Sequence, residues 1–444
     1  MTIFALSTGT VKSGIAIIRV SGKETKKIVK NLTKLSELTP RKATLCNFYE
    51  VDNKELIDTG FIIWFPGPKS YTGEDLAELH VHGSKAVVSA LLLEFSKFED
   101  CRLAEPGEFT KLAYENNKLN LLDVEALSDL ISSETEMQRK QALKILSGDA
   151  EKKYVSLRNR MLKILSYVEA KIDFPEEDLP VDILSNIKSE VEDILKMINK
   201  ILNDGRIGEK IRDGFNIAIL GPTNAGKSSL FNYFSKREVA IVSNIQGTTR
   251  DLLQVNLNLD GYPVVLTDTA GLRETHDEIE KKGVDLSYKA AKEADLKLVL
   301  LEAKNPYFTE FLTKVSLDDC IIVLNKADLL SAPINIEDDK LKNHVLISIK
   351  NETNLDELIN QIKSKLKEKF LKNNNVLISR ERHRINLEKC RQHLSSFLQN
   401  NSLEEFDKAS EDLRLATRHL GKVVGDVDVE EVLGKIFNDF CIGK

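Results

Sequence analysis

A glycine-rich loop between a predicted strand and a predicted helix carries the clearest chemistry in this sequence. The stretch FNIAILGPTNAGKSSLFN places Gly221, Gly226, Lys227 and Ser228 in the pattern G-x-x-x-x-G-K-[ST]. The glycines allow successive backbone N–H groups to converge on phosphate oxygens at the positive end of the following helix. We expect Lys227 to bridge the β- and γ-phosphates of a nucleotide and the Ser228 hydroxyl to coordinate Mg²⁺.

Two further motifs each end a predicted strand, VVLTDTAG and VLNKAD. In the first, Asp268 can hold Mg²⁺ through water and Gly271 can sense the γ-phosphate. In the second, Asn325 and Asp328 suit guanine, because a carboxylate accepts hydrogen bonds from both the ring N1–H and the exocyclic N2–H. Adenine offers no such pair, so the motif favours GTP over ATP.

Two shorter segments complete the expected GTPase signature. GTTRD lies between the loop and the DTAG strand, and its Thr249 is a reasonable switch residue that closes on Mg²⁺. ISIK supplies Ser348, Ile349 and Lys350 at the place of the last guanine-binding loop. Together the motifs predict a GTPase.

The group that activates the attacking water is not obvious from these motifs. Leu272 follows DTAG where a signalling GTPase carries a glutamine, and an aliphatic side chain cannot orient water. Another group must act as the base if the chain hydrolyses GTP. The acidic residues just downstream, each of which is otherwise a solvated part of a helix face, are Glu274, Asp277, Glu278 and Glu280.

Length and composition indicate a chain of several globular domains. The 444 residues are 42% hydrophobic and 30% charged with a net charge of -6, which argues against nonspecific coating of nucleic acid. The five cysteines contain no CxxC pair, which fits a reducing compartment without structural zinc. No apolar run is long enough to span a membrane, and the terminal CIGK lacks the last residue that prenylation needs. We therefore expect a cytoplasmic protein.

The glycine content and the spacing of apolar residues change three times along the chain. Residues 1–118 read as mixed α/β, with strands expected at 14–22 and 60–67, and residues 211–374 alternate apolar strands with helices. Residues 119–210 and 375–444 are poor in glycine and show helical spacing of apolar residues. One predicted apolar stripe consists of Leu184, Ile187, Val191, Leu195, Ile198 and Leu202. We expect an α/β domain inserted into a helical domain, since insertions succeed where chain ends lie close together. Four independent domains in a row are the alternative.

The whole chain resembles the tRNA-modification GTPase family called MnmE or TrmE. The resemblance runs from residue 3 to residue 444. It rests on IRVSG, YTGEDLAELHVHG, AEPGEFTKLAYENNKLNL, DFPEEDL, GPTNAGKSSLFN, AIVSNIQGTTRD, DTAGLRE and FCIGK.

The resemblance implies a fold and a reaction. It implies a multi-domain α/β plus α protein with a folate-binding-like N-terminal domain and a helical domain interrupted by an inserted P-loop GTPase domain. It also implies a homodimer that works with a flavin (FAD)-dependent MnmG or GidA subunit, as a heterotetramer, on tRNA. The complex builds a (carboxymethyl)aminomethyl group on carbon 5 of the wobble uridine, position 34, with carbon from a 5-formyl or methylene tetrahydrofolate. GTP hydrolysis is expected to depend on K⁺.

The resemblance also assigns residues to the nucleotide site. K⁺ would be held by Asn224, Ser243, Ile245 and Thr248, and Glu280 would orient the attacking water. A monovalent cation against the phosphates can neutralise charge as an arginine finger does. The full set expected to hold the nucleotide and its ions is Asn224, Ala225, Gly226, Lys227, Ser228, Ser229, Ser243, Asn244, Ile245, Gln246, Gly247, Thr248, Thr249, Asp268, Thr269, Ala270, Gly271, Asn325, Lys326, Asp328, Ser348, Ile349 and Lys350.

A second set of residues is implied for the folate. The family positions that contact the folate correspond here to Arg19, Glu78, Lys118 and Lys444. The cations suit the carboxylates of the folate, and a carboxylate suits the donor edge of the pterin ring. Without the resemblance, Arg19 and Lys118 would be read as ordinary surface ion pairs. The tail is expected to return to the N-terminal domain or that of its dimer mate, where Gly443 permits a close approach.

Cys441 in this tail admits two interpretations. It can be a nucleophile that adds to carbon 6 of the uridine to activate carbon 5. It can equally be a small buried hydrophobe where the tail docks.

Two other functions share the GTPase motifs. A ribosome-assembly GTPase that binds RNA without modifying it would carry a strongly basic appendage, and a dynamin-like GTPase would carry a membrane-binding patch. Neither feature is visible in the sequence. The basic stretch SRERHR at 379–384 is read either as an RNA contact or as a solvated helix start.

Overall fold

A computed structural model gives the fold of this chain. It describes residues 1–173, 183–237, 240–241, 253–268, 289–306, 316–332, 341, 343–371, 377–399, 406–427, 433–434, 436–437, 440 and 443. The chain forms two compact units. The first contains residues 1–131, 145–162 and 417–444, and the second contains residues 132–144 and 163–416.

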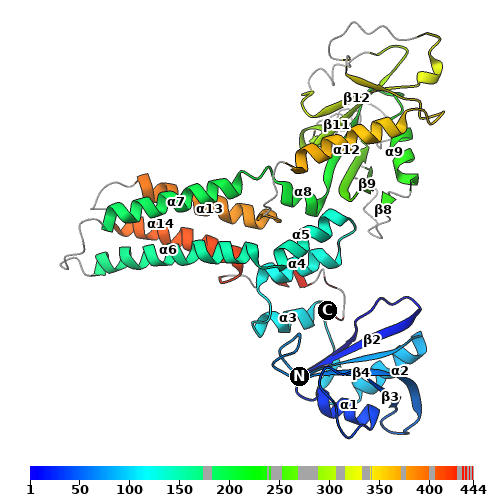
Figure 1. Cartoon of the computed structure of the whole chain (residues 1–444), viewed down its shortest axis with the longest axis vertical. Coiled ribbons are helices and arrows are strands. Elements are labelled where there is room, and N and C mark those ends of the chain that lie inside the picture. The colour runs from blue at the N-terminus through cyan, green and yellow to red at the C-terminus, as the bar shows by residue number, and fades with distance from the viewer. Residues whose placement is uncertain are drawn as a thin grey trace, which may run out of the picture. The chain divides into compact units, whose positions relative to one another are not determined.

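A six-stranded sheet lies in the N-terminal part of the first unit (Figure 1). Its strands are β1 Thr2–Leu6, β2 Ser13–Ser21, β3 Thr44–Tyr49, β4 Leu56–Phe65, β5 Leu76–Gly83 and β6 Cys101–Leu103. They lie in the order β3-β4-β5-β2-β1-β6, and only β1 and β6 run parallel to each other. Helices α1 (Thr25–Thr33) and α2 (Lys85–Ser96) pack on this sheet over a core that contains Ile18 and Phe95. The strands expected at 14–22 and 60–67 are confirmed as β2 and β4.

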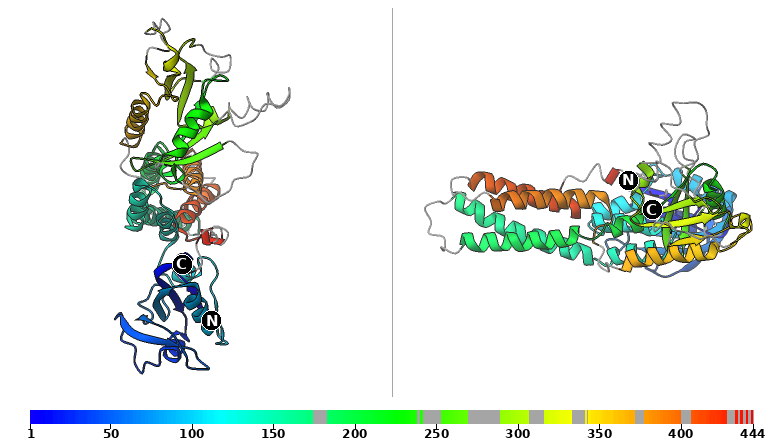
Figure 2. Two further views of the ribbon diagram at one scale, coloured as in Figure 1. Left: turned by 90° about the vertical axis from the view of Figure 1, so that its right-hand side faces the viewer. Right: turned by 90° about the horizontal axis from the view of Figure 1, so that it is seen from above.

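In the described part of the chain, helices α3 to α8 precede the second sheet in sequence, and α13 and α14 follow it. They are α3 Glu108–Glu115, α4 Leu121–Ile131, α5 Glu136–Leu146, α6 Asp149–Asp173, α7 Ile183–Leu202, α8 Ile207–Asp213, α13 Glu381–Gln399 and α14 Phe406–Val424. Helix α13 packs against α7, and Figure 2 shows the long green and orange helices side by side. In α14, Arg414 Nε donates to Glu169 Oε1 of α6 at 2.8 Å. Helices from before and after the second sheet therefore pack together, as an interrupted helical domain requires.

The apolar face of α7 differs in one position from the predicted stripe. Ile187, Val191 and Ile198 are buried as expected, but Ile194 lies between them where Leu195 was predicted. Both spacings fit a helical period, and Leu195 remains half-buried beside the core. The buried face of α7 therefore includes Ile194 in place of the adjacent residue, Leu195.

A seven-stranded sheet with helices forms the α/β part of the second unit (Figure 1). Its elements are β7 Phe215–Leu220, α9 Lys227–Lys236, β8 Ala240–Ile241, β9 Leu253–Leu259, β10 Tyr262–Asp268, β11 Leu296–Glu302, β12 Cys320–Asn325, the 3₁₀ turn η1 Ala327–Leu329, β13 His344–Leu346 and α12 Leu355–Leu371. The strand order is β13-β12-β11-β7-β10-β9-β8. The first five strands are parallel, so the carboxyl ends of β7, β10 and β12 meet at one edge.

The predicted fold class is confirmed: an α/β N-terminal part, and helices interrupted by a P-loop α/β sheet. The domain boundaries at 118/119, 210/211 and 374/375 stay predictions. The DFPEEDLP turn expected at 173–180 lies almost entirely outside the described residues.

The basic stretch at 379–384 fits neither predicted interpretation at three of its positions, where the side chains are buried. Ser379, His383 and Arg384 are only 2%, 1% and 7% exposed. At these three positions the stretch is neither a solvated helix start nor a surface for RNA, because the side chains lie inside the protein.

Candidate active site

The glycine loop connects β7 to α9 at the carboxyl edge of the second sheet. Gly226 precedes the helix with φ +101°, a conformation that L side chains rarely adopt. Lys227 begins α9, and its Nζ donates to the carbonyl oxygens of Gly221 and Pro222 at 2.9 and 2.8 Å. The ammonium is therefore held across the loop. Burial lowers the pKa of Lys227 below its ordinary value, and the charge of Asp268 opposes that shift.

Two oxygen-bearing side chains, those of Ser228 and Asp268, lie side by side next to this loop. The Ser228 hydroxyl donates to Asp268 Oδ2 at 2.9 Å, and the Asp268 residue is fully buried. Mg²⁺ prefers oxygen ligands and is commonly bound by one or two carboxylates plus substrate phosphates. A serine hydroxyl and a carboxylate beside the phosphate loop fit that preference, and the Mg²⁺ roles of these two residues stay predictions.

Replacing the serine hydroxyl gives a direct test of this pair. In Ser228→Ala we expect GTP turnover to fall by about 100-fold and its Mg²⁺ midpoint to rise, because one oxygen ligand is lost. Turnover measured across a Mg²⁺ titration checks this. Ser235→Ala in the same helix is the control, since that hydroxyl only donates to the Phe231 carbonyl oxygen at 2.9 Å. An unchanged Mg²⁺ dependence in Ser228→Ala would contradict the role.

The other end of the site is built around an asparagine that connects two loops. Asn325 Nδ2 donates to the carbonyl oxygen of Ala225, 2.9 Å away. Its Oδ1 accepts from the Ile349 backbone N–H at 3.3 Å. Asn325 is 3% exposed and so acts as a brace between the phosphate loop and the loop after β13.

The acidic residue expected to read guanine is held by a serine. Ser348 Oγ donates to Asp328 Oδ1 at 2.6 Å, and this hydrogen bond is the main cause that lowers the pKa of Asp328. The carboxylate is therefore ionised at neutral pH, as an acceptor of two N–H groups must be. Lys326, between Asn325 and Asp328, forms an ion pair with Glu302 at 3.3 Å.

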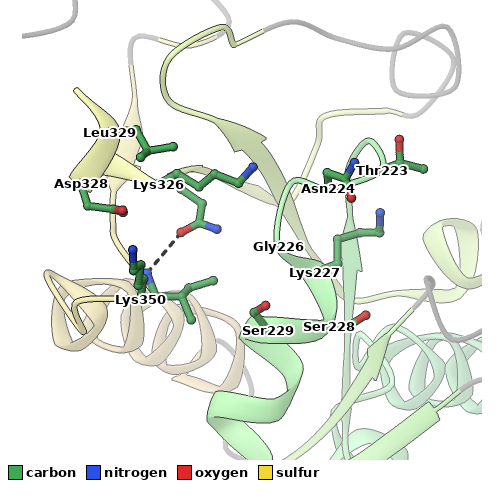
Figure 3. A pocket seen from close by; sticks show the side chains of 12 residues that line it. Thr223, Asn224, Gly226, Lys227, Ser228, Ser229, Lys326, Asp328, Leu329 and Lys350 are labelled. Atoms are coloured by element: carbon green, nitrogen blue, oxygen red, sulfur yellow. Dashed lines mark hydrogen bonds between the residues drawn. The ribbon is translucent and has the colours of Figure 1, made fainter. Parts of the chain in front are cut away.

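A cavity of about 700 Å³ joins the two ends of the site. Figure 3 shows Asn224 and Lys227 on one side of it and Asp328 on the other. Its lining residues are Thr223, Asn224, Gly226, Lys227, Ser228, Ser229, Asn325, Lys326, Asp328, Leu329, Ile349 and Lys350. Ten of these were predicted to bind the nucleotide. The cavity has room for an organic ligand of nucleotide size.

The sequence interpretation missed two lining residues. Thr223 and Leu329 line the cavity, and neither has a side chain that a phosphate or guanine motif requires. Leu329 is 52% exposed, which is unusual for a leucine. Its position directly after Asp328 was the available signal. Three residues predicted to bind the nucleotide do not line the cavity but form hydrogen bonds with residues that do. They are Ala225, Asp268 and Ser348.

Several predicted site residues lie outside the described part of the chain. They are Ser243, Asn244, Ile245, Gln246, Gly247, Thr248, Thr249, Thr269, Ala270, Gly271, Glu280, Cys441 and Lys444. Their roles stay predictions.

The predicted folate residues of the first unit are only partly brought together. Arg19 on β2 lies opposite Glu78 on β5, and its Nη2 donates to Glu78 Oε1 at 2.7 Å. The guanidinium also lies 5.4 Å from the centre of the Tyr71 ring. Lys118 is exposed, and its side chain runs next to Gly73. Arg19 is thus ion-paired, but the two side chains are only 19% and 18% exposed, unlike an ordinary surface pair, and the folate role of both residues stays a prediction.

The tail returns to the N-terminal sheet, as predicted. Ser7 Oγ, just after β1, donates to the carbonyl oxygen of Gly443 at 2.8 Å. A Cβ added at Gly443 would lie 2.2 Å from the Leu6 carbonyl oxygen, so only glycine permits this approach. Phe437 and Phe440 are buried in a cluster with Val124 of α4.

Comparisons with known proteins cover the whole chain. The family model described as "GTP-binding protein TrmE N-terminus" matches residues 2–118, and "MnmE helical domain" matches residues 121–441. A relative from Pelagibacter ubique, "tRNA modification GTPase MnmE", is 58% identical over 100% of both chains. The chain belongs to the MnmE family.

Other MnmE relatives agree with this assignment. Proteins of the same name are 44% identical in Wolbachia sp. subsp. Drosophila simulans and 41% identical in Parvibaculum lavamentivorans, over 100% of this chain and 99% and 100% of theirs. The resemblance seen in the sequence is confirmed, and the chain is a P-loop GTPase of a family that modifies tRNA. Across the described residues, no helix has both the length and the apolar character needed to cross a membrane.

Proposed function

We propose that this chain is a K⁺-dependent GTPase that installs the (carboxymethyl)aminomethyl group at carbon 5 of wobble uridine 34 in certain tRNAs. It acts in the cytoplasm as a homodimer with a flavin-dependent MnmG/GidA-type subunit and a tetrahydrofolate one-carbon unit. The observation that carries the proposal is a single cavity lined by both the phosphate loop and the Asp328 carboxylate, in a chain matched to MnmE relatives over its full length.

The described residues bind and orient the nucleotide in this proposal. Lys227 and the amides at the start of α9 meet the phosphates, and Asp328 meets the guanine. Ser228 and Asp268 would hold Mg²⁺, which when bound would supply charge neutralisation at the phosphates. Lys227 already lies across the loop, so little reorganisation is needed to bring its charge to the phosphates.

The hydrolytic step needs a group that Leu272 cannot provide. We assign the orientation of the attacking water to Glu280, and the binding of K⁺ to Asn224 together with Ser243, Ile245 and Thr248. Asn224 lines the cavity beside the phosphate loop, and its side-chain oxygen supports its assignment as one K⁺ ligand. A carboxylate suits the water because it accepts its proton through a hydrogen bond.

The folate assignment rests on the first unit. Arg19 and Glu78 offer a cation and a carboxylate next to each other, beside the Tyr71 ring. That combination suits a ligand with an aromatic ring system, an N–H edge and carboxylates. The proposal adds Lys118 and Lys444 as further cations. The docked Gly443 supports the approach of the tail to this unit.

The test compares salts and one glutamate. In K⁺ we expect GTP turnover at least about 10-fold faster than in Na⁺, and Glu280→Ala to lose about 10³-fold in K⁺ because the water is no longer oriented. Glu278→Ala is the control. Nucleoside analysis of tRNA from a deletion strain carrying either variant checks the modification.

Two results would overturn the proposal. Equal GTP turnover in K⁺ and Na⁺ would contradict the K⁺ dependence. Normally modified wobble uridines in the deletion strain itself would contradict the role in tRNA modification.

A further inference from the structure

Helix α1 of the first unit and its two flanking residues carry a concentration of positive charge. Residues 23–34 contain five lysines and a single acidic residue, Glu24, in a chain whose net charge is -6. One of the five lysines is half-buried, and the other four are exposed. We name this set the lysine face, and its members are Lys23, Lys26, Lys27, Lys30 and Lys34.

The helical period places the lysines on the side of α1 that faces away from the sheet. Lys26, Lys27 and Lys30 fall within an arc of about 100° at 3.6 residues per turn. The opposite side of the helix is apolar and packs into the core of the first sheet. Its residues, each 0% exposed, are Ile28, Val29 and Leu32.

The remaining two lysines extend the lysine face at both ends of the helix. Lys23 directly precedes the N-cap residue, and Lys34 is the C-cap. Lys34 Nζ lies 3.4 Å from the centre of the Tyr49 ring on β3, which is an edge strand of the sheet. The positive charge therefore continues from the helix to the edge of the sheet.

Helix stability does not account for this arrangement. Lys26 and Lys27 lie in the first turn, which contains no acidic residue, and positive charge is unfavourable there because the helix dipole is positive at its N-terminus. Lys30 lies four residues from both Lys26 and Lys34, a spacing at which like charges repel each other. Departures from such local rules are typical of functional sites.

The lysine face has little negative charge of its own. Lys27 pairs with Glu24 Oε2 at 2.9 Å, but the two side chains are 72% and 36% exposed, and such surface pairs contribute little. Among the residues that the structure describes, Lys23, Lys26 and Lys30 form no ion pair. These ammonium groups are therefore available to an external anion.

The dimensions of the lysine face favour a polyanion. From Lys23 to Lys34 the chain advances by about 16 Å at 1.5 Å per residue, and a nucleic acid strand presents several phosphates over such a length. An acidic membrane is a poorer match, because a helix on a membrane surface inserts its apolar side into the lipid. In α1 that side is already buried in the core of the protein.

We propose that the lysine face binds the phosphate backbone of tRNA. The inference rests on the proposed function for the identity of the RNA, and it adds a surface with which this chain holds its substrate. Phosphate contacts position a nucleic acid without reading its sequence. The lysine face therefore orients the tRNA and does not select among tRNAs.

The lysine face lies on the other side of the sheet from the residues proposed for the folate. Ile18 and Val20 of β2 belong to the core that α1 covers. Arg19 lies between them and points to the opposite face, because side chains alternate along a strand. In this proposal, the lysine face thus contacts a part of the tRNA other than the reacting uridine, and its lysines can be changed without altering the Arg19–Glu78 pair.

The test removes the three lysines that form no ion pair. The full-length variant Lys23→Gln, Lys26→Gln, Lys30→Gln is compared with wild type for binding of a tRNA transcript over a KCl titration. We expect affinity to fall by at least about 10-fold, and the dependence of log K on log salt to become shallower by about 2, since each phosphate contact contributes about 0.7–0.9. Substrate and non-substrate tRNAs should lose affinity equally.

A matched control separates the lysine face from overall charge. It removes three exposed lysines that each pair with a carboxylate of their own helix, and it should bind tRNA within about 2-fold of wild type. Its substitutions are Lys111→Gln, Lys140→Gln and Lys152→Gln. The melting temperature of the lysine-face variant should not fall, because the substitutions relieve repulsion on α1.

The reaction with the flavin-dependent partner gives a second readout. For the lysine-face variant we expect the KM for tRNA to rise by about 10-fold while kcat for uridine modification and GTP turnover stay unchanged, because binding alone is weakened. This measurement decides the question if the chain alone binds tRNA too weakly to measure.

The outcomes distinguish this inference from the proposed function. An unchanged KM and unchanged tRNA affinity in the lysine-face variant would overturn the inference, as would an equal loss in the control. Loss of binding to phosphatidylglycerol vesicles with tRNA binding intact would assign the lysine face to a membrane and also overturn it. Absence of modification by the wild-type complex would refute the proposed function, whereas the binding titration would still test the lysine face.

Discussion

Asp328→Asn is expected to lower the affinity of the chain for GTP by about 10³-fold. In the role we propose for Asp328, its carboxylate accepts two hydrogen bonds from guanine. An amide offers one acceptor and one donor, so an N–H group of the base would meet another N–H group. The Ser348 hydroxyl keeps its partner position either way, so the loop is retained. Xanthine presents a carbonyl oxygen where guanine has its amino group, and the variant should therefore prefer xanthosine triphosphate.

Equilibrium binding of the two nucleotides measures this exchange. Glu302→Gln is the matched control, because Glu302 pairs with the neighbouring Lys326 at 3.3 Å and does not line the cavity. The control should bind GTP within about 2-fold of wild type. The lowered pKa of Asp328 keeps the carboxylate ionised at pH values below its ordinary range, so binding through this group should weaken only in acid. GTP binding unaffected by Asp328→Asn would place the base elsewhere.

Gly226→Ala should have the second large effect, through the shape of the phosphate loop. The residue has φ +101°, and an added Cβ would lie 2.3 Å from Asn325 Nδ2. The methyl group must displace Asn325, which braces the loop through its bonds to Ala225 and Ile349. We expect a loss of about 2–4 kcal/mol in the free energy of unfolding and at least a 100-fold loss of GTP affinity, both on the order expected for a strained, overpacked loop.

Chemical denaturation and nucleotide binding, each on the full chain, report the two parts of this effect. Gly434→Ala is the control, because a Cβ added there would meet no atom within 4 Å and the backbone lies outside the left-handed region. Wild-type GTP affinity in Gly226→Ala would show that the loop tolerates a side chain, contrary to its geometry here.

The parts of the site that the sequence predicted are contiguous motifs. The phosphate loop and the Asp328 turn each place their residues by local backbone geometry, so their residue order alone was enough. The parallel strands could also be predicted from their apolar runs, because strands buried on both faces consist almost entirely of apolar residues. Gly443 was also anticipated, from the need for a close approach.

The parts that were not predicted depend on partners far away in sequence. Arg384 meets Asp204 and Glu209 across 180 and 175 residues, and no local pattern marks that meeting. The pairing of Arg19 with Glu78 needs the register of β2 against β5, which hydrophobic alternation does not specify to one residue between polar positions. On α7, Ile194 and Leu195 are equally apolar, and tertiary packing alone chose the first.

The docking of Gly443 beside Leu6 has a consequence for how the protein is made. The first unit is assembled from residues 1–131, 145–162 and 417–444, so its cluster around Phe437 and Phe440 cannot close until residues 417–444 have been translated. The second unit, apart from its first residues, is synthesised in between and has time to fold on the ribosome. A chain that stops before Phe437 would therefore contain every strand of the second sheet but would lack the Phe437 and Phe440 side chains that complete this cluster of the first unit.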